Sequence, residues 1–366
     1  MEPQQSIAII GAGPSGLVYA RLLESGGITD YVIYKRDELA TPGPWQQGGT
    51  LDLHGPSGQL ALTRASLFDK FSEDLARWEA PGLHIVDSRG ATLLLDSVPA
   101  HKIRWGHAVS TIERNTDSPQ ATGDNGCIIR FVNGTSATGF RLIVGADGAW
   151  SKVRPLLTSA KPVYSGKKFI EGSLSHDNPN YKIATEMVGP GNMEALGNGI
   201  KMAVQQVSNG TYRVYFGFPV PEDFYHHRQP STVTSTEPTS KTDATAEGPF
   251  RAWPLYRMEP ESVGWDRGVA PGVILLGDAA HLSTPFAGEG VNCSMYDAVV
   301  LADRIIEGCG NNAGLAIMKD TELETVLALY EEDMFQRGRD LIQRSTKSET
   351  MLFAQDAAAQ FQKVFK

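Results

Sequence analysis

Three glycines near the start of the chain have the spacing that binds a pyrophosphate. Gly11, Gly13 and Gly16 form G-x-G-x-x-G between the apolar run Ile7–Ile10 and a second apolar run. In a strand–turn–helix, such glycines permit a tight turn, close backbone approach to a pyrophosphate and close packing of helix on strand. The free N–H groups of the helix N-terminus then bind the phosphates. A plain glycine turn is the alternative, but a second strand, predicted at 31–34, follows at the right distance.

The position that usually recognises a ribose in this arrangement is occupied by a lysine. An acidic residue normally ends the second strand and holds the ribose hydroxyls. Here Lys35 stands there, followed by Arg36 and Asp37. Because lysine cannot accept a hydrogen bond, we expect ribose binding to be weakened or to pass to Asp37.

Two aspartates follow further predicted strands. Asp147-Gly148 follows the apolar run Phe140–Val144, and Asp278 follows Val273–Leu276. Asp278 can bind a ribityl or ribose hydroxyl, whereas a simple turn is the alternative for Asp147-Gly148.

A glycine-rich turn comes after Asp278. Residues 285–290 are predicted to form a turn that leads into a helix starting near Val291, and such a helix N-terminus can stabilise negative charge on a ligand. We interpret His281 as a packed, hydrogen-bonded structural histidine rather than a base.

Two other regions are predicted to position these residues. Residues 50–54 alternate like a strand within a glycine-rich stretch, which is either an edge strand or a backbone lying close to a flat ligand, with Asp52 as a polar contact. Residues 163–224 alternate like an antiparallel sheet, with strands at 199–207 and 211–219. Its side chains that could face a pocket are Glu171, Lys201, Gln205, Tyr215 and Phe218.

Composition limits the function further. The chain has 366 residues, a formal net charge of −9 and three cysteines without metal-site spacing. This argues against nucleic-acid binding, a membrane patch and a metal site. The first strand begins within a few residues, so we expect no signal peptide and a reducing, cytoplasmic location.

Three stretches in order resemble one family. GAGPSG at 11–16, GADG at 145–148 and LLGDAAHLSTPFAGEGVN at 275–292 are similar to the FAD-dependent aromatic hydroxylases, the group of para-hydroxybenzoate hydroxylase. Within that group, the resemblance is closest to the tetracycline-degrading flavin monooxygenases. It implies an α/β fold: a Rossmann-like FAD-binding domain (1–160 and 250–320), an antiparallel β-sheet substrate domain (161–249, with a polar loop at 231–248) and a C-terminal helical segment (321–366).

The resemblance also implies a cofactor, a reaction and a set of contacts. FAD would be reduced by NADPH or NADH, and O₂ would then hydroxylate an aromatic or polyketide-like small molecule, most consistent with secondary-metabolite biosynthesis in a monomer or weak homodimer. No catalytic base is assigned. The residues implied to contact FAD are Gly11, Gly13, Gly16, Arg36, Asp52, Asp147, Gly148, Asp278, Pro285, Gly288, Gly290, Val291 and Asn292.

The chain departs from the family in two places. Lys35 replaces the ribose-binding glutamate. After Gly90, a strand and the first turns of a helix, about twenty residues in all, are missing. The family opens that helix with an FAD-binding arginine, whereas Arg89 is predicted to lie in a turn at 88–90. A divergent enzyme, a decayed copy and a gene model with removed segments all fit this shortening.

Other functions follow less well from these motifs. A catalytically impaired flavoprotein and tetracycline-type inactivation remain alternatives. A flavin-dependent halogenase would need a W-x-W-x-I-P motif that the chain lacks, and a plain NAD dehydrogenase leaves Asp278 and residues 285–292 without a role. We expect the helical tail at 322–365 to pack on the outside and to carry no chemistry of its own.

Overall fold

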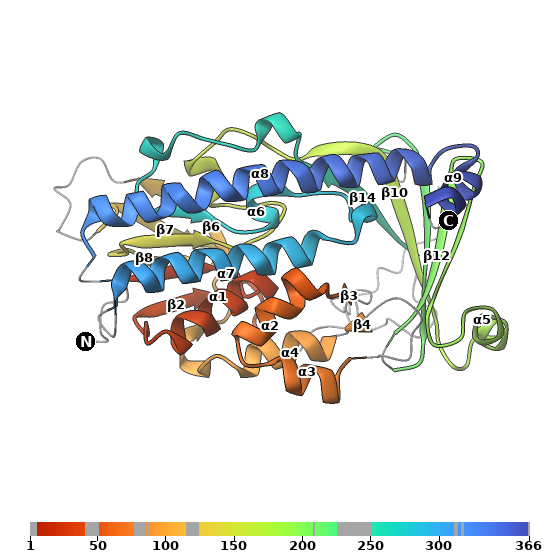
Figure 1. Cartoon of the computed structure of the whole chain (residues 1–366), viewed down its shortest axis with the longest axis horizontal. Coiled ribbons are helices and arrows are strands. Elements are labelled where there is room, and N and C mark those ends of the chain that lie inside the picture. The colour runs from red at the N-terminus through yellow and green to blue at the C-terminus, as the bar shows by residue number, and fades with distance from the viewer. Residues whose placement is uncertain are drawn as a thin grey trace.

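The fold places a parallel sheet and an antiparallel sheet at opposite ends of an elongated molecule (Figure 1). The computed structural model describes residues 6–40, 51–76, 85–86, 88–114, 124–207, 209–224, 250–310, 314–315 and 318–364. The predicted polar loop at 231–248 lies outside these residues. Among the described residues, no helix is both long enough and apolar enough to cross a membrane.

The parallel sheet forms the centre of the hydrophobic core. Four of its five strands are buried along their whole length, as expected for a sheet covered on both faces. Its strands in spatial order are β15 (Val273–Leu275), β9 (Leu142–Gly145), β1 (Ile7–Ile10), β2 (Tyr31–Tyr34) and β5 (Ile103–Arg104). The strands predicted around the first glycine motif are therefore confirmed.

Helices cover this sheet in a layer that extends across the molecule. Helix α1 (Pro14–Ser25) packs on α7 (Gly290–Cys309), which packs on α8 (Asp320–Leu352). Figure 1 shows α8 running from the parallel sheet to the antiparallel sheet. The shorter helices are α2 (Leu60–Arg64), α3 (Phe68–Asp74), α4 (Ser88–Asp96), α6 (Asp278–His281) and α9 (Ala357–Val364).

The antiparallel sheet has two different faces. Its strands in spatial order are β11 (Asn192–Gly197), β12 (Ile200–Gln206), β13 (Tyr212–Pro219), β10 (Val163–Leu174) and β14 (Arg251–Arg257). Helix α5 (Tyr181–Val188) covers one face, where Ala184 packs with Val204 and Tyr212. Strands predicted at 199–207 and 211–219 are confirmed as β12 and β13.

Two small sheets complete the fold. One pairs β3 (Leu51–Asp52) with β4 (Ile85–Val86), and the other consists of β6 (Val109–Arg114), β7 (Cys127–Phe131) and β8 (Ser136–Ala137).

Two expectations from the sequence were wrong. Residues 88–90 are the first turn of α4 rather than an isolated turn, so Arg89 lies at a helix start directly after β4. Helix formation carried through Gly90 because the following apolar residues Leu93 and Leu94 bury one side of the helix in the core. The tail does not simply pack on the outside: α8 buries the side chains of Glu331 and Glu349, and both make ion pairs.

Candidate functional site

The glycine motif and both predicted aspartates meet at one edge of the parallel sheet. Gly11, Asp147 and Asp278 follow the carboxyl ends of β1, β9 and β15, which are neighbours in the sheet. Main-chain bonds hold the three turns together, for example from Ala146 N to Ile10 O at 2.8 Å. The crevice beyond the carboxyl ends of such strands is where open α/β sheets bind dinucleotides.

The glycines create a cradle that side chains would fill. Gly11 has φ +111°, and a Cβ there would lie 2.3 Å from Ala146 O; a Cβ on Gly16 would lie 2.2 Å from Gly11 O. Around Gly13, by contrast, nothing lies within 4 Å of the corresponding position. Gly13 is the N-cap of α1 and provides no side-chain cap, so the first N–H groups of the helix are available to a phosphate.

The two aspartates present unused carboxylate oxygens. Asp147 Oδ2 accepts a hydrogen bond from Lys152 N at 2.6 Å, but its buried Oδ1 has no partner within the described residues. The Asp278 carboxylate makes no hydrogen bond there either, and burial raises the pKa of both groups. Arg154 joins the two turns by donating to Ala279 O and Ala149 O. The unpaired carboxylate oxygens can accept hydrogen bonds from hydroxyls of a ligand, and the glycine cradle with its free N–H groups can accept a pyrophosphate.

The ribose position at the end of β2 carries an ion pair. Lys35 Nζ lies 2.9 Å from Asp37 Oδ2, and Arg36 Nε lies 3.5 Å from Asp37 Oδ1. The Arg36 side chain is 81% exposed. Asp37 is thus the carboxylate present at this end of β2, and it is ion-paired with Lys35.

Asn292 connects the start of α7 to the segment that contains Asp52. Its Oδ1 accepts from His54 N at 2.8 Å, and its Nδ2 donates to Asp52 O at 2.6 Å. Gly58 makes this possible, because a Cβ there would lie 2.5 Å from Asn292 Oδ1. The structure therefore brings Asp52 and Asn292 together, although they are 240 residues apart in sequence.

His281 belongs to a buried polar network, so the prediction that it is packed and hydrogen-bonded is confirmed. Its Nε2 lies 2.6 Å from Asp297 Oδ2, which also accepts from Gly277 N at 2.9 Å. Arg337 donates to Asp297 Oδ1 at 2.8 Å. Interaction with Asp297 raises the pKa of His281 in spite of its burial, and both cationic partners lower the pKa of Asp297. His281, Cys293 and Asp297 lie close enough together to bind a metal ion. The carboxylate of Asp297 is, however, already paired with the Arg337 guanidinium.

The face of the antiparallel sheet opposite α5 points toward the turn at 285–288. Phe169 on this face contacts Phe286, with 5.7 Å between ring centroids. The strand register places Glu171, Lys201, Gln205 and Tyr215 on the face of Phe169, whereas Phe218 pairs with Lys168 and lies on the other face. Four of the five predicted pocket residues therefore share the face toward the crevice.

Polar groups on this face are arranged around Glu171. Its carboxylate accepts from Arg213 Nη1 at 2.9 Å and from Trp253 Nε1 at 2.6 Å. The hydroxyl of Tyr215, which lies opposite Glu171 on β13, makes no hydrogen bond within the described residues. Burial and the nearby Glu171 charge raise the pKa of Tyr215 to about 12. Its hydroxyl stays protonated near neutral pH and can donate to a bound molecule.

Sequence reasoning missed the residues that hold the turn after Asp278. Thr284 contacts Ser345 and Glu349 of α8, and Glu349 also contacts Lys167 of β10. The i, i+4 spacing of Ser345 and Glu349 placed them on one helix face, but a mixed-charge helix gives no sign of which face is buried.

Comparison with protein families supports the cofactor. Residues 95–324, more than half of the chain, match the family model described as FAD binding domain. Monooxygenase asqM of Emericella nidulans is 26% identical over 439 aligned positions, covering 97% of each chain. Monooxygenase penA of Penicillium thymicola is 27% identical over 434 positions, covering 98% of each.

Solved structures of flavin enzymes share the fold. The Klebsiella pneumoniae HpxO complex with FAD and uric acid superposes with a TM-score of 0.69 at 20% identity, covering 100% of this chain and 92% of HpxO. The tetracycline destructase Tet(51) superposes with a TM-score of 0.68 at 16% identity, covering 99% and 95%. These likenesses confirm the predicted Rossmann-like and antiparallel-sheet architecture.

The alignments also show that the chain is internally short. The alignment with asqM spans 439 positions, whereas this chain has 366 residues, so at least 73 positions have no counterpart here. The resemblance predicts a missing segment of about twenty residues after Gly90, and the alignment length gives the total shortfall of the chain without its positions.

Proposed function

Because this chain belongs to the FAD binding domain family and is an FAD-dependent monooxygenase of that kind, we propose that it uses NADPH or NADH and O₂ to hydroxylate an electron-rich aromatic or polyketide-like small molecule. The observation that carries the proposal is the meeting of three turns at one edge of the parallel sheet. Gly11, Asp147 and Asp278 meet at the carboxyl edge of the parallel sheet, and a polar face of the second sheet lies opposite.

Each part of the crevice has a role in holding FAD. The N–H groups after Gly13 would bind the pyrophosphate, and Asp278 would accept hydrogen bonds from the ribityl chain. The N-terminus of the 20-residue helix α7 would stabilise negative charge on the flavin ring. Bound FAD would supply the redox chemistry that this chain's own side chains do not provide.

The opposite sheet face would bind and orient the substrate. The Tyr215 hydroxyl can donate a hydrogen bond to a phenol or enol oxygen, and Arg213 and Trp253 fix Glu171 beside it. Phe169 and Phe286 add a flat apolar wall. This combination of an apolar wall and a few placed polar groups suits a planar molecule with an oxygen substituent.

Secondary-metabolite tailoring is the role that the relatives favour. The two monooxygenases that align with almost the whole chain come from the fungi Emericella nidulans and Penicillium thymicola. The likeness to Tet(51) supports the fold, and tetracycline inactivation is a second candidate substrate class.

The visible absorption spectrum of the purified protein, with and without added FAD, tests the proposal first. We expect oxidised-flavin bands that NADPH or NADH bleaches under anaerobic conditions. Oxygen uptake with 3-amino-4-hydroxybenzoate, urate and tetracycline as probes would then compare substrate classes. A folded protein that takes up no FAD would contradict the proposal.

A catalytically impaired flavoprotein is the competing function. The observation that favours it is the absence of at least 73 aligned positions relative to asqM. It predicts normal flavin bands that neither nicotinamide cofactor bleaches, so the same spectra separate the two functions.

A further inference from the structure

The turn between Asp278 and α7 is held by α8 at both of its ends. We call residues 284–289 the 284–289 loop. At its start, the Thr284 and Ser345 hydroxyl oxygens lie 2.9 Å apart, and Ser345 Oγ donates to Thr284 O at 2.5 Å. At its end, Arg344 Nη2 lies 2.6 Å from Glu289 Oε2. Adjacent residues of one helix therefore determine where the loop begins and ends.

One buried carboxylate connects this loop to the antiparallel sheet. Glu349 is 3% exposed, and its Oε2 accepts from Thr284 Oγ1 at 3.0 Å. Its Oε1 lies 2.6 Å from Lys167 Nζ on β10. Because the two oxygens bind different elements, the single side chain relates the loop, the sheet and α8 to one another.

An aromatic layer next to Glu349 follows the same three elements. Phe286 of the loop lies between Phe169 of β10, at 5.7 Å, and Phe353 after α8, at 5.3 Å. Lys167 Nζ lies 5.2 Å from the Phe353 ring centroid. Edge-to-face packing fixes the relative orientation of the three rings. The Lys167–Glu349 ion pair fixes the position of the sheet relative to α8.

We propose that Glu349 is a positioning residue that holds the 284–289 loop against the flavin-binding crevice and sets its distance from the substrate-facing sheet. The inference rests on the proposed function, because the loop leads into α7, whose N-terminus faces the flavin in that function. A buried ion pair is costly to desolvate, and its best-supported use is to specify one geometry among alternatives. Glu349 would specify how the 284–289 loop, strand β10 and helix α8 are placed relative to one another, and the proposed flavin site depends on that placement.

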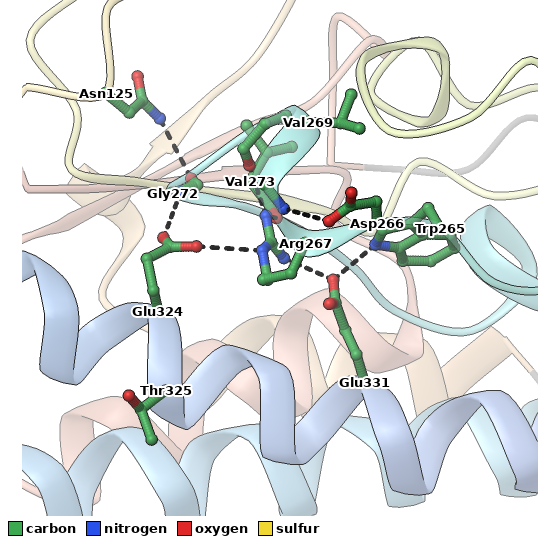
Figure 2. A network of polar contacts seen from close by, with 12 residues as sticks. Asn125, Trp265, Asp266, Arg267, Val269, Gly272, Val273, Glu324, Thr325 and Glu331 are labelled. Atoms are coloured by element: carbon green, nitrogen blue, oxygen red, sulfur yellow. Dashed lines mark hydrogen bonds and ion pairs between the residues drawn. The ribbon is translucent and has the colours of Figure 1, made fainter.

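The test compares two buried glutamates of the same helix. Glu331 is also buried and ion-paired, but it lies toward the other end of α8, where it contacts Arg267 and Trp265 (Figure 2). Glu349→Gln and Glu331→Gln therefore remove one buried carboxylate each, and only the first touches the loop. FAD affinity from fluorescence titration and the wavelengths of the visible bands of bound FAD are the measurements.

We expect Glu349→Gln to raise the Kd for FAD about tenfold and to shift the visible bands, because the loop loses its fixed position. Glu331→Gln should leave the Kd within about twofold of wild type with unchanged bands. Equal Kd values and equal spectra for Glu349→Gln and wild type would overturn the inference.

A second variant keeps the test decisive if Glu349→Gln does not fold. Arg344 is half-exposed and holds the other end of the loop, so Arg344→Gln should fold and should raise the Kd about threefold with a smaller band shift. An unchanged Kd and spectrum in this variant would count against the inference. Wild-type protein that binds no FAD would instead overturn the proposed function, so the two failures are distinguishable.

Discussion

The two turns that lead into helices α1 and α7 are held in place in different ways. Residues 11–16 follow strand β1 directly, whereas residues 284–289 follow the short helix α6, which comes after β15. Residues 11–16 are positioned by their own glycines, because Gly16 packs on Gly11 and Gly11 packs on Ala146. The 284–289 loop is positioned by Arg344, Ser345 and Glu349 of a helix that begins some thirty residues later.

This difference explains what a motif can and cannot reveal. A turn in which the backbone packs too closely for a Cβ needs glycine at those positions, and so the spacing of glycines in the sequence predicts it. A turn held by distant carboxylates and hydroxyls leaves its mark elsewhere in the chain. The following variants test this comparison, in order of decreasing expected effect.

Gly11→Ala should affect both the fold and FAD binding. The added Cβ would lie 2.3 Å from Ala146 O, and φ of +111° is unfavourable for alanine. We expect a loss of about 4 kcal/mol or more in the free energy of unfolding and no retained flavin. Urea unfolding and the flavin absorbance after gel filtration measure the two effects. Wild-type values for both would show that the first turn is not self-supporting.

Asp297→Asn should destabilise the base of the second turn. Asp297 holds Gly277 N, His281 and Arg337, and the change leaves the buried His281 without its carboxylate and Arg337 with only the exposed Asp333 as a partner. We expect the free energy of unfolding to fall by about 3–5 kcal/mol. Asp333→Asn, which removes the exposed partner of the same Arg337, is the control and should cost less than about 1 kcal/mol. Similar losses in both variants would contradict the prediction.

Glu331 should make stability depend on pH without involving either turn. Burial raises the pKa of Glu331 to about 7 from an ordinary 4.5, although Arg267 opposes this shift. The folded state therefore holds the proton more tightly, and stability falls as pH rises from about 4.5 to about 7, by no more than about 3 kcal/mol. The urea midpoint of wild type should be lower at pH 7.5 than at pH 5 through this group.

The variant Glu331→Gln should remove that part of the pH dependence, because glutamine does not titrate. Glu332→Gln, at the exposed neighbouring position, should leave it unchanged. The same pH dependence in wild type and Glu331→Gln would place the titrating group elsewhere. Glu324 and Trp265 also contact the Arg267–Glu331 pair, as Figure 2 shows. Because salt screens interactions between such charges, all variants should be compared at the same salt concentration.

Gly13→Ala should weaken FAD binding without destabilising the fold. Nothing lies within 4 Å of the position of its Cβ, so the methyl group would enter only the space that a pyrophosphate needs. We expect the urea midpoint of wild type and about a tenfold higher Kd for FAD. An unchanged Kd would remove Gly13 from the phosphate site while leaving the role of Gly11 intact.

Much of the crevice could be predicted before the structure was known. The strands around Gly11, the turn at Asp147 and the strand before Asp278 were all visible as apolar runs that end in glycine or aspartate. The first turn of α4 was not visible, because Gly90 is a weak helix former and its favourable packing comes from the residues that follow. The face of β10 and β13 that points to the crevice could not be chosen either, because alternation shows two faces and does not say which one is covered.

By itself, the sequence determined the family, the parallel sheet and the glycine cradle, since each depends on residues close together in the chain. Tertiary structure alone decided that Asn292 hydrogen-bonds the backbone of Asp52 and His54, and that Glu349 joins Thr284 to Lys167. The physical reason is range: steric needs of the backbone act on neighbouring residues, whereas buried polar groups must find their partners wherever the fold brings them.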